Sequence, residues 1–199
     1  MDKSLTTVLP SCTIAAGETS TLASCTEMSC SRSTQLIYTI NATFNAAATL
    51  GLVVYFFTSV DNSTYDSIAW DSWNVENVRQ VGYSGADLSW MFGETVTAQA
   101  GGTGVVTNWT LDSGTWAGDD AAGNIHLSSL TGTWTNGQTL SGGTSGCAAT
   151  QSTVTTANAH TSTYYPTTPT PMYIKARVHN LDTTQSITLC SLGAVAQTI

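Results

Sequence analysis

The chain has 199 residues, of which 41% are hydrophobic and only 9% are charged, and its formal net charge is −8. This length and apolar content can build a core in one large domain or in two small ones. Its five basic residues are too few to form the stripe that neutralises nucleic-acid phosphates or binds an anionic membrane surface. We therefore expect neither a nucleic acid nor a membrane among its partners.

Thr and Ser take the place that Lys and Glu hold in most soluble proteins. Short β-branched and hydroxyl side chains fit a pleated, half-buried surface and compete poorly inside helices. The composition therefore predicts an all-β chain. The polar amino end lacks the apolar segment of a secretory signal, and the longest apolar stretch, residues 46–57, is too short to span a bilayer.

The first strongly patterned segment is residues 35–44, in which apolar and polar side chains alternate as in a half-buried strand. Residues 50–57 form a short continuous apolar run, and their β-branched and aromatic content favours a central strand over a helix. Residues 61–66 are rich in side chains that tolerate turns and predict a hairpin loop.

The middle of the chain is rich in glycine and contains two internal echoes. Residues 93–97 (GETVT) recur as residues 137–141 (GQTLS), and residues 114–116 (GTW) recur as residues 132–134. Each copy is predicted to start a strand after a tight turn in which Gly supplies a positive φ. Two related β units, filled by the tryptophans of this region, predict a small barrel or sandwich.

Near the carboxyl end, residues 173–178 and 186–190 alternate on either side of a turn at residues 180–184, which predicts a closing hairpin. A Thr/Pro-rich stretch at residues 166–171 precedes it and reads as an extended linker.

The predicted organisation is nested. Residues 35–84 and 165–199 would form a β-sandwich of jelly-roll or immunoglobulin-like type, preceded by residues 1–34 as an N-terminal arm or first strand. Residues 85–164 would be an inserted small β-barrel or β-sandwich domain with a Pro-rich return linker. Insertion at a loop is tolerated because the ends of a loop lie close together. The alternative is two domains in tandem.

Five cysteines, an odd number, do not suit a secreted disulfide framework. Cys25 and Cys30 lack the spacing and second pair of a zinc site. We expect buried, reduced thiols. A disulfide from Cys12 to Cys25 or Cys30, or a metal, is the alternative.

No nucleophile elbow, phosphate-binding loop or zinc-protease motif is present. His126, His160 and His179 are isolated in sequence, and His126 is expected on the solvent face of a strand. Asp119 and Asp120 could help to hold Ca²⁺, but solvated acids in a turn explain them as well.

Pairing Asp119 or Asp120 with Glu94 is the only hydrolase arrangement that can be suggested, and the spacing does not recommend it. The loop at residues 61–66 lacks the Gly and the distal Glu of a calcium-binding EF-hand loop. We predict no catalytic residue, no metal and no cofactor.

Six tryptophans could include a platform for sugar rings, although core packing is the plainer interpretation. Trp70 and Trp73 would point to opposite sides if both lay on one strand. The full set is Trp70, Trp73, Trp90, Trp109, Trp116 and Trp134.

Five segments of the chain carry a resemblance to known proteins: residues 3–9, 13–17, 44–49, 57–66 and 172–188. They resemble structural proteins of tailed-phage particles, and residues 113–123 are similar to small β modules inserted in phage head and tail proteins. The resemblance implies a virion component and brings no catalytic residues.

From this resemblance we predict a non-enzymatic capsid decoration or auxiliary protein on the particle surface, attached through its sandwich. Its partners would be major capsid or tail subunits and further copies of itself, with a trimer as the candidate. The alternative is a tail- or fibre-associated module that binds a host glycan or another receptor.

Overall fold

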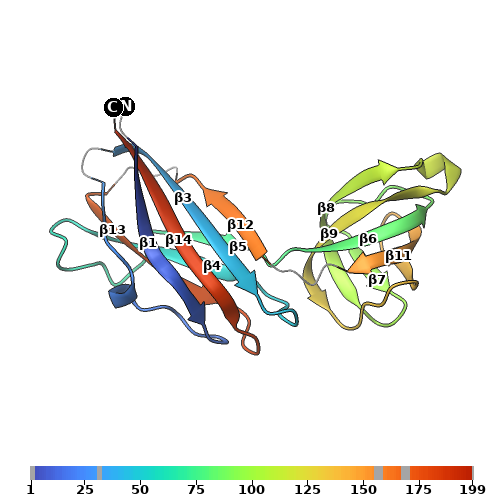
Figure 1. Ribbon diagram of the computed structural model, residues 1–199, viewed down its shortest axis with the longest axis horizontal. Helices are drawn as coiled ribbons and strands as arrows, with labels where there is room; N and C mark the ends of the chain where they lie inside the picture. Colours follow the sequence, from blue (N-terminus) through green and yellow to red (C-terminus); the bar gives the residue numbers. More distant parts are fainter. Residues whose placement is uncertain (1–2, 31–32, 155–158, 167–170, 199) are drawn as a thin grey trace. The chain divides into compact units, whose positions relative to one another are not determined.

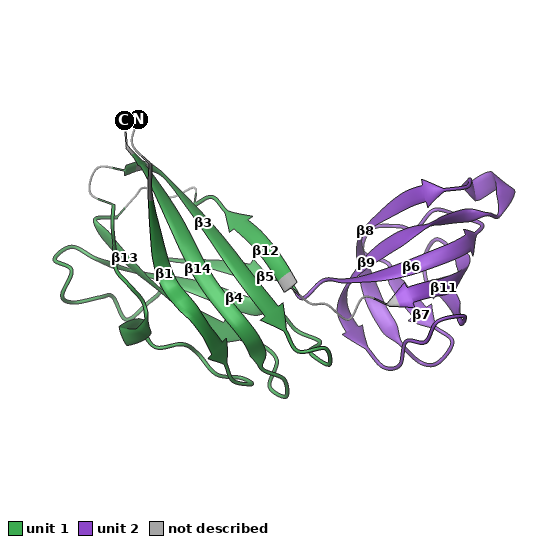
Figure 2. Cartoon of the chain, in the orientation of Figure 1, with its two compact units in different colours: residues 1–76, 159–199 green, residues 77–158 purple. Residues whose placement is uncertain are grey.

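The computed structural model describes residues 3–30, 33–154, 159–166 and 171–198, which form an all-β protein (Figure 1). Two compact units divide the chain. Unit 1 comprises Met1–Glu76 and Ala159–Ile199, and unit 2 comprises Asn77–Asn158 (Figure 2). Unit 2 is thus inserted into unit 1. The boundaries differ by several residues from the expected 84/85 and 164/165.

Unit 1 consists of two four-stranded antiparallel sheets, with the short 3-10 helix η1 (Leu22–Ser24) after the first strand. The first sheet has the order β1 (Lys3–Ile14), β14 (Ile187–Thr198), β3 (Ser33–Phe44) and β12 (Ala159–Tyr164). The second has the order β2 (Met28–Ser29), β13 (Tyr173–Asn180), β4 (Leu52–Ser59) and β5 (Asp71–Val75).

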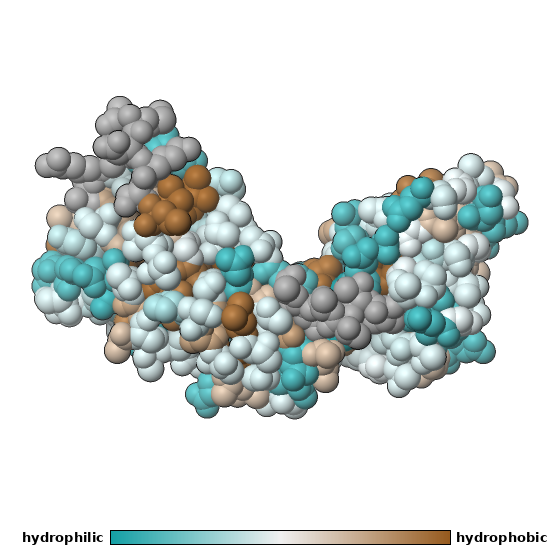
Figure 3. Space-filling model, in the orientation of Figure 1, coloured by the Kyte–Doolittle hydropathy of each residue, from teal (hydrophilic) through white to brown (hydrophobic). Residues whose placement is uncertain are grey.

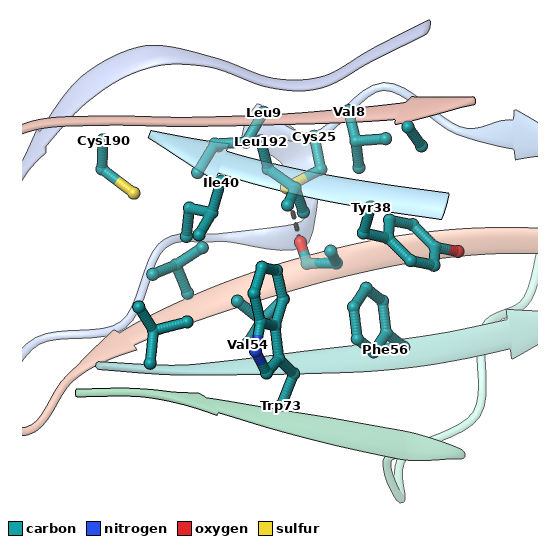
Figure 4. Close-up of a cluster of buried hydrophobic side chains, with 14 of the residues drawn as sticks. Val8, Leu9, Cys25, Tyr38, Ile40, Val54, Phe56, Trp73, Cys190 and Leu192 are labelled. Atoms are coloured by element: carbon teal, nitrogen blue, oxygen red, sulfur yellow. Dashed lines mark hydrogen bonds between the residues drawn. The ribbon is translucent and has the colours of Figure 1, made fainter. Parts of the chain in front are cut away.

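The two strands expected early in the chain are confirmed. β3 buries every second side chain, from Leu36 to Phe44, and β4 is buried along most of its length between β13 and β5. Side chains of both sheets form one core, in which the rings of Tyr38 and Phe56 lie 4.4 Å apart (Figure 4). Tyr164 of β12 stacks on Trp73 of β5 and donates its hydroxyl to Asp71, which joins the edges of the two sheets.

The segment before the predicted linker and the predicted arm are both part of this fold, while most of the predicted linker at residues 166–171 lies outside the described residues. β12, expected within the inserted segment 85–164, pairs with β3 throughout its length. β1 pairs with β14 and buries Val8, Leu9 and Ile14, so the described part of residues 1–34 packs on its own chain. Strands that are rich in Thr and only weakly apolar resemble linkers in sequence. They are recognised as strands only by the strands with which they pair.

The predicted closing hairpin is wrong. β13 and β14 follow one another in sequence but lie in different sheets. Buried Asn180, at the end of β13, donates to the carbonyls of Ala15 and Gln185, and Asp182 accepts from the amides of Thr49 and Thr184. These hydrogen bonds hold the connection that takes the chain from the second sheet to the first. Two strands show the same alternation of side chains whether they pair as a hairpin or lie in different sheets, so the sequence pattern does not distinguish the two arrangements.

Unit 2 is a closed six-stranded barrel with its own core. Its order around the barrel is β10 (Thr139–Gly142), β11 (Ala148–Val154), β6 (Arg79–Ala86), β9 (Ala121–Thr131), β8 (Thr103–Ser113) and β7 (Thr95–Ala98). A single 3-10 turn, η2 (Trp116–Gly118), joins β8 to β9.

The echo of residues 93–97 in 137–141 corresponds to a structural repeat. β7 and β10 pair antiparallel, with Thr97 opposite Ser141. The same sequence separation relates Val81 of β6 to Ile125 of β9, and these two residues are also opposite partners. The barrel therefore consists of two three-stranded copies, β6–β8 and β9–β11, that face each other around a local two-fold axis.

The second echo is not a repeat of structure. Gly114 and Thr115 lead into η2, whereas Gly132 and Trp134 lie in the connection between β9 and β10. The residue equivalent to Trp134 is Trp90, in the connection between β6 and β7.

Candidate functional site

The barrel presents two equivalent loops, residues 87–93 and 131–137, one from each copy. Each contains a tryptophan followed three residues later by a glycine, and Gly93 and Gly137 have φ values of +79° and +85°. Trp90 is fully buried and meets Tyr83 edge-on, while half-buried Trp134 donates its indole N–H to the Thr131 carbonyl. The last turn of each loop is built in the same way, because the amides of Glu94 and Gln138 donate to the carbonyls of Met91 and Thr135. The loops differ nearer their start, where Gly132 has a φ of +70° that Leu88 does not share.

Glu94, which follows the first loop, anchors the turn of the opposite copy. Its carboxylate accepts bonds from the amides of Met91, Thr144 and Ser145 at 2.6, 3.1 and 2.9 Å. Burial raises the pKa of Glu94, but the bonds from Ser145 and Met91 outweigh it and leave the pKa lowered. This carboxylate is an ionised structural anchor and is not poised to donate a proton.

Gln138 is the equivalent residue in the second copy and makes the reciprocal contact. Its side-chain oxygen accepts from the Ala100 amide at 2.8 Å, in the β7–β8 turn, and its amide donates to Gln151 at 2.7 Å. Glu94 and Gln138 therefore hold each other's hairpins, which explains why both polar residues are buried.

The two loops differ at five of their seven positions, and at three of these the first loop has a large exposed apolar side chain. Leu88, Met91 and Phe92 in the first loop are 49%, 49% and 77% exposed. Their counterparts Gly132, Thr135 and Asn136 are small or polar and also exposed. The second copy has no apolar side chain at these three positions, yet its Gln138 amide donates to the Thr135 carbonyl as the Glu94 amide does to the Met91 carbonyl. We call Leu88, Met91 and Phe92 the apolar loop.

The acidic pair Asp119–Asp120 lies in the exposed β8–β9 connection. Asp120 accepts from the Thr115 amide at 2.8 Å, and Asp119 has a left-handed φ of 55°. This is a turn whose acid caps its own backbone. It does not meet Glu94, whose carboxylate serves the β10–β11 turn. Across the described residues, no group of three His, Cys, Asp or Glu side chains could hold a metal ion.

The loop at residues 61–66 connects β4 to β5, as expected for a hairpin. Asp61 accepts from Ser59, Ser63 and Thr64, and the bonds from Thr64 and Ser63 lower its pKa. An open pocket of about 480 Å³ adjoins this loop, and Asp66 at its wall accepts from Thr58. Asp61 and Asp66, the two carboxylates that line the pocket, therefore already accept hydrogen bonds from the loop and from the end of β4.

The three histidines lie apart. His126 is half-buried on β9 between buried Ile125 and Leu127, which point to the other side. His160 packs against the Phe44 ring in the first sheet of unit 1, and His179 Nδ1 is 2.9 Å from the Thr19 hydroxyl at the second sheet.

The tryptophans mainly fill cores. Trp73 and Trp90 are buried, and the other four are half-buried. Trp70 precedes β5 and packs on the same core as Trp73, so the expected opposite orientation does not apply. Trp116 stacks on Tyr83 at 5.9 Å.

All five cysteines are free thiols in the structure. The Cys25 thiol donates to the Ala176 carbonyl and the Cys30 thiol to the Met28 carbonyl, so neither is joined to Cys12. Burial raises the pKa of Cys30 and Cys190 to about 12 and of Cys147 to about 11. These thiols are therefore mainly protonated at neutral pH, and each must lose its proton before it can react.

Figure 3 shows one face of the protein, on which pale and hydrophilic residues predominate and hydrophobic ones form small patches. No helix among the described residues has the length and apolarity needed to cross a membrane. Comparison with family models, curated proteins and solved structures finds no match to this chain. The apolar loop is therefore the feature that best defines a candidate functional site.

Proposed function

We propose that the chain is a non-enzymatic structural component of a phage particle, a capsid decoration or auxiliary protein at the particle surface. Unit 1 would be a sandwich of jelly-roll or immunoglobulin-like type. The observation that carries the proposal is the apolar loop, which exposes three large side chains at positions where the barrel's own second copy has small or polar ones. Exposed apolar clusters on a polar surface are typical of protein contacts.

The use of the acidic side chains supports a non-catalytic role. Glu94, Asp61, Asp120 and Asp182 each accept hydrogen bonds from neighbouring backbone amides. A hydrolase needs one carboxyl group free to give a proton and another placed to act as base or nucleophile. These four carboxylates instead stabilise turns, as rigid scaffolding requires.

The exposed apolar loop supports an attachment point on the barrel, in place of the sandwich that the sequence favoured. Phe92 and Met91 are unbranched or aromatic side chains of the kind that anchor interfaces when they enter a pocket of the partner. The partner would be a major capsid or tail subunit, and a homo-oligomer such as a trimer would place several apolar loops on one lattice.

The proposal is tested first by mass spectrometry of purified particles of the phage that encodes the chain, in which the chain must be found. The double variant Met91→Thr, Phe92→Asn then gives the first loop the residues of the second. We expect it to fold normally and to lose at least about tenfold of its affinity for particles lacking the wild-type chain. Co-sedimentation at several protein concentrations measures this.

The matched control is Ile68→Ser, which removes an equally exposed apolar side chain from unit 1. It should bind particles as the wild type does. Absence of the chain from particles, or equal binding by the double variant, contradicts the proposed attachment.

A second candidate is a tail- or fibre-associated module that binds a host glycan. It is favoured by Trp116, a half-buried indole in an otherwise exposed turn. A glycan array distinguishes the two functions, because Trp116→Ala should abolish any glycan signal and leave particle binding unchanged.

A further inference from the structure

Three thiols gather in unit 1, where the first and last strands of the chain run side by side. Cys12 of β1 lies directly opposite Cys190 of β14 in the antiparallel ladder. The Cys25 thiol lies within electrostatic range of Cys12, and the Cys190 thiol within range of both. The sequence, in which Cys12 and Cys190 are far apart, suggested Cys25 or Cys30 as the partner of Cys12.

Both members of the opposite pair face the same side of the sheet. Cys190 is fully buried and points its sulfur into the core (Figure 4). Cys12 is half-buried and packs against that same core. Opposite residues of an antiparallel pair have Cα atoms about 4.5 or 5.5 Å apart, and disulfides span about 4.4–6.8 Å. The ladder therefore brings the two backbones within disulfide range.

Cys25 is held away from this pair by its own contact. Its thiol donates to the carbonyl of Ala176, on β13 of the opposite sheet, as the dashed line in Figure 4 marks. Forming a bond with Cys12 would require that hydrogen bond to break. Cys190 is thus the better placed partner.

Cys12 is the more exposed member of the pair. An open pocket of about 240 Å³ lies against Cys12, between the end of β1 and the segment that leads to η1. Its walls include Thr13, Glu18 and Ser24. Cys190, in contrast, is closed off from solvent and can react only through Cys12.

We propose that Cys12 and Cys190 form a redox pair whose reactant is a small-molecule disulfide such as oxidised glutathione. The Cys12 thiolate attacks one sulfur of the reagent, breaks its S–S bond and releases one small thiolate. The Cys190 thiolate then attacks the Cys12 sulfur of the mixed disulfide and releases the second small thiolate. The two protein thiols give up two electrons to the reagent, and their two protons pass to the released thiolates.

The bond would clamp the two ends of the chain. β1 is an edge strand whose ladder partner is β14, and it would become covalently tied to that partner. The closed loop would include nearly the whole chain, and cross-links that close long loops restrict the unfolded state most. Oxidation would therefore add a covalent bond to an edge strand that hydrogen bonds and packing already hold.

The test is incubation of the full-length native protein with oxidised glutathione, followed by peptide mapping under non-reducing conditions. We expect loss of two of the five thiols and a single cross-linked peptide that joins Cys12 to Cys190. The melting temperature of unit 1 should rise by about 5 °C or more relative to the reduced protein. Cys12→Ser should remove both effects.

Two control variants separate this pair from the other thiols. Cys147→Ser changes a buried cysteine of the barrel, and Cys25→Ser removes the third thiol of the cluster; both should retain the cross-link. A bond from Cys12 to Cys25, a stable mixed disulfide at Cys12, or an unreacted Cys12 would overturn the proposal. This test does not depend on whether the chain is found in a phage particle.

Discussion

Asp182 shows how a single carboxylate determines the path of the chain in unit 1. It is buried and accepts from the amides of Thr49, Thr184 and Gln185 at 2.8–2.9 Å. It thereby joins the β13–β14 connection to the segment before β4. Burial by itself raises the pKa of Asp182, but the hydrogen bonds from Thr49 and Thr184 have the larger effect and lower the pKa to about 2.

This lowered pKa predicts that the stability of unit 1 depends on pH. Because the pKa in the folded state is below that of the unfolded chain, the stabilisation is complete above about pH 4 and is lost as the pH falls toward 2. Asp182→Asn should therefore destabilise unit 1 by about 2 kcal/mol at pH 7 and by much less at pH 2. Urea unfolding, followed by hydrogen exchange in β13 and β14, measures both values.

Asp119→Asn is the control, because Asp119 is exposed and Asn tolerates its left-handed backbone. It should leave the stability of both units unchanged. A difference for Asp182→Asn that is equally large at both pH values would contradict the assigned role of the charge.

At the scale of elements, the barrel is held by two reciprocal clamps. Glu94 precedes β7 and binds the β10–β11 turn, and Gln138 precedes β10 and binds the β7–β8 turn. Each turn leaves backbone amides that β-ladders cannot satisfy, and the long side chain of the other copy supplies the acceptor. The clamps therefore couple the two copies into one closed barrel.

Removal of one clamp should loosen one turn of the barrel. Glu94→Ala leaves the amides of Met91, Thr144 and Ser145 without their acceptor, and we expect a loss of about 2–4 kcal/mol in barrel stability. Amide hydrogen exchange should accelerate first in β10 and β11. Glu76→Ala, at an exposed glutamate of unit 1, should have no such effect, and equal exchange in both variants would contradict the clamp.

At the scale of the whole molecule, each unit has its own core and its own closed set of strand pairs. In the barrel, Val154 near the end of β11 is paired with Val81 near the start of β6. The start of the first strand and the end of the last strand of unit 2 are thus side by side, as insertion requires.

Residues 77–158 should accordingly fold alone. We expect the isolated segment to show the same strand pairs by NMR and to unfold cooperatively, because closure leaves no open sheet edge to be covered by unit 1. Unit 1 with a short Gly/Ser bridge from Glu76 to Ala159 is the matched counterpart and should also fold. A segment that is unfolded alone would show that the barrel depends on unit 1.

Local pattern was sufficient for part of this description. Alternation in residues 35–44 and apolarity in residues 50–57 predicted β3 and β4, because side-chain period and burial on both faces are written directly in the order of residues. The repeat of GETVT in GQTLS similarly predicted two related β units. Nothing in residues 87–93 alone marked the apolar loop, since an apolar loop becomes visible only when its polar counterpart is known.

The amino-acid sequence by itself thus predicted the all-β class, the nested order of two units and the positions of several strands, among them β3, β4, β7 and β10. Tertiary structure alone decided that β13 and β14 part into different sheets, that residues 3–14 complete a sheet, and that Cys12 faces Cys190. The physical reason is that strand identity depends on neighbours in sequence, whereas strand partnership depends on backbone hydrogen bonds between distant segments, which leave no periodic signature in either strand.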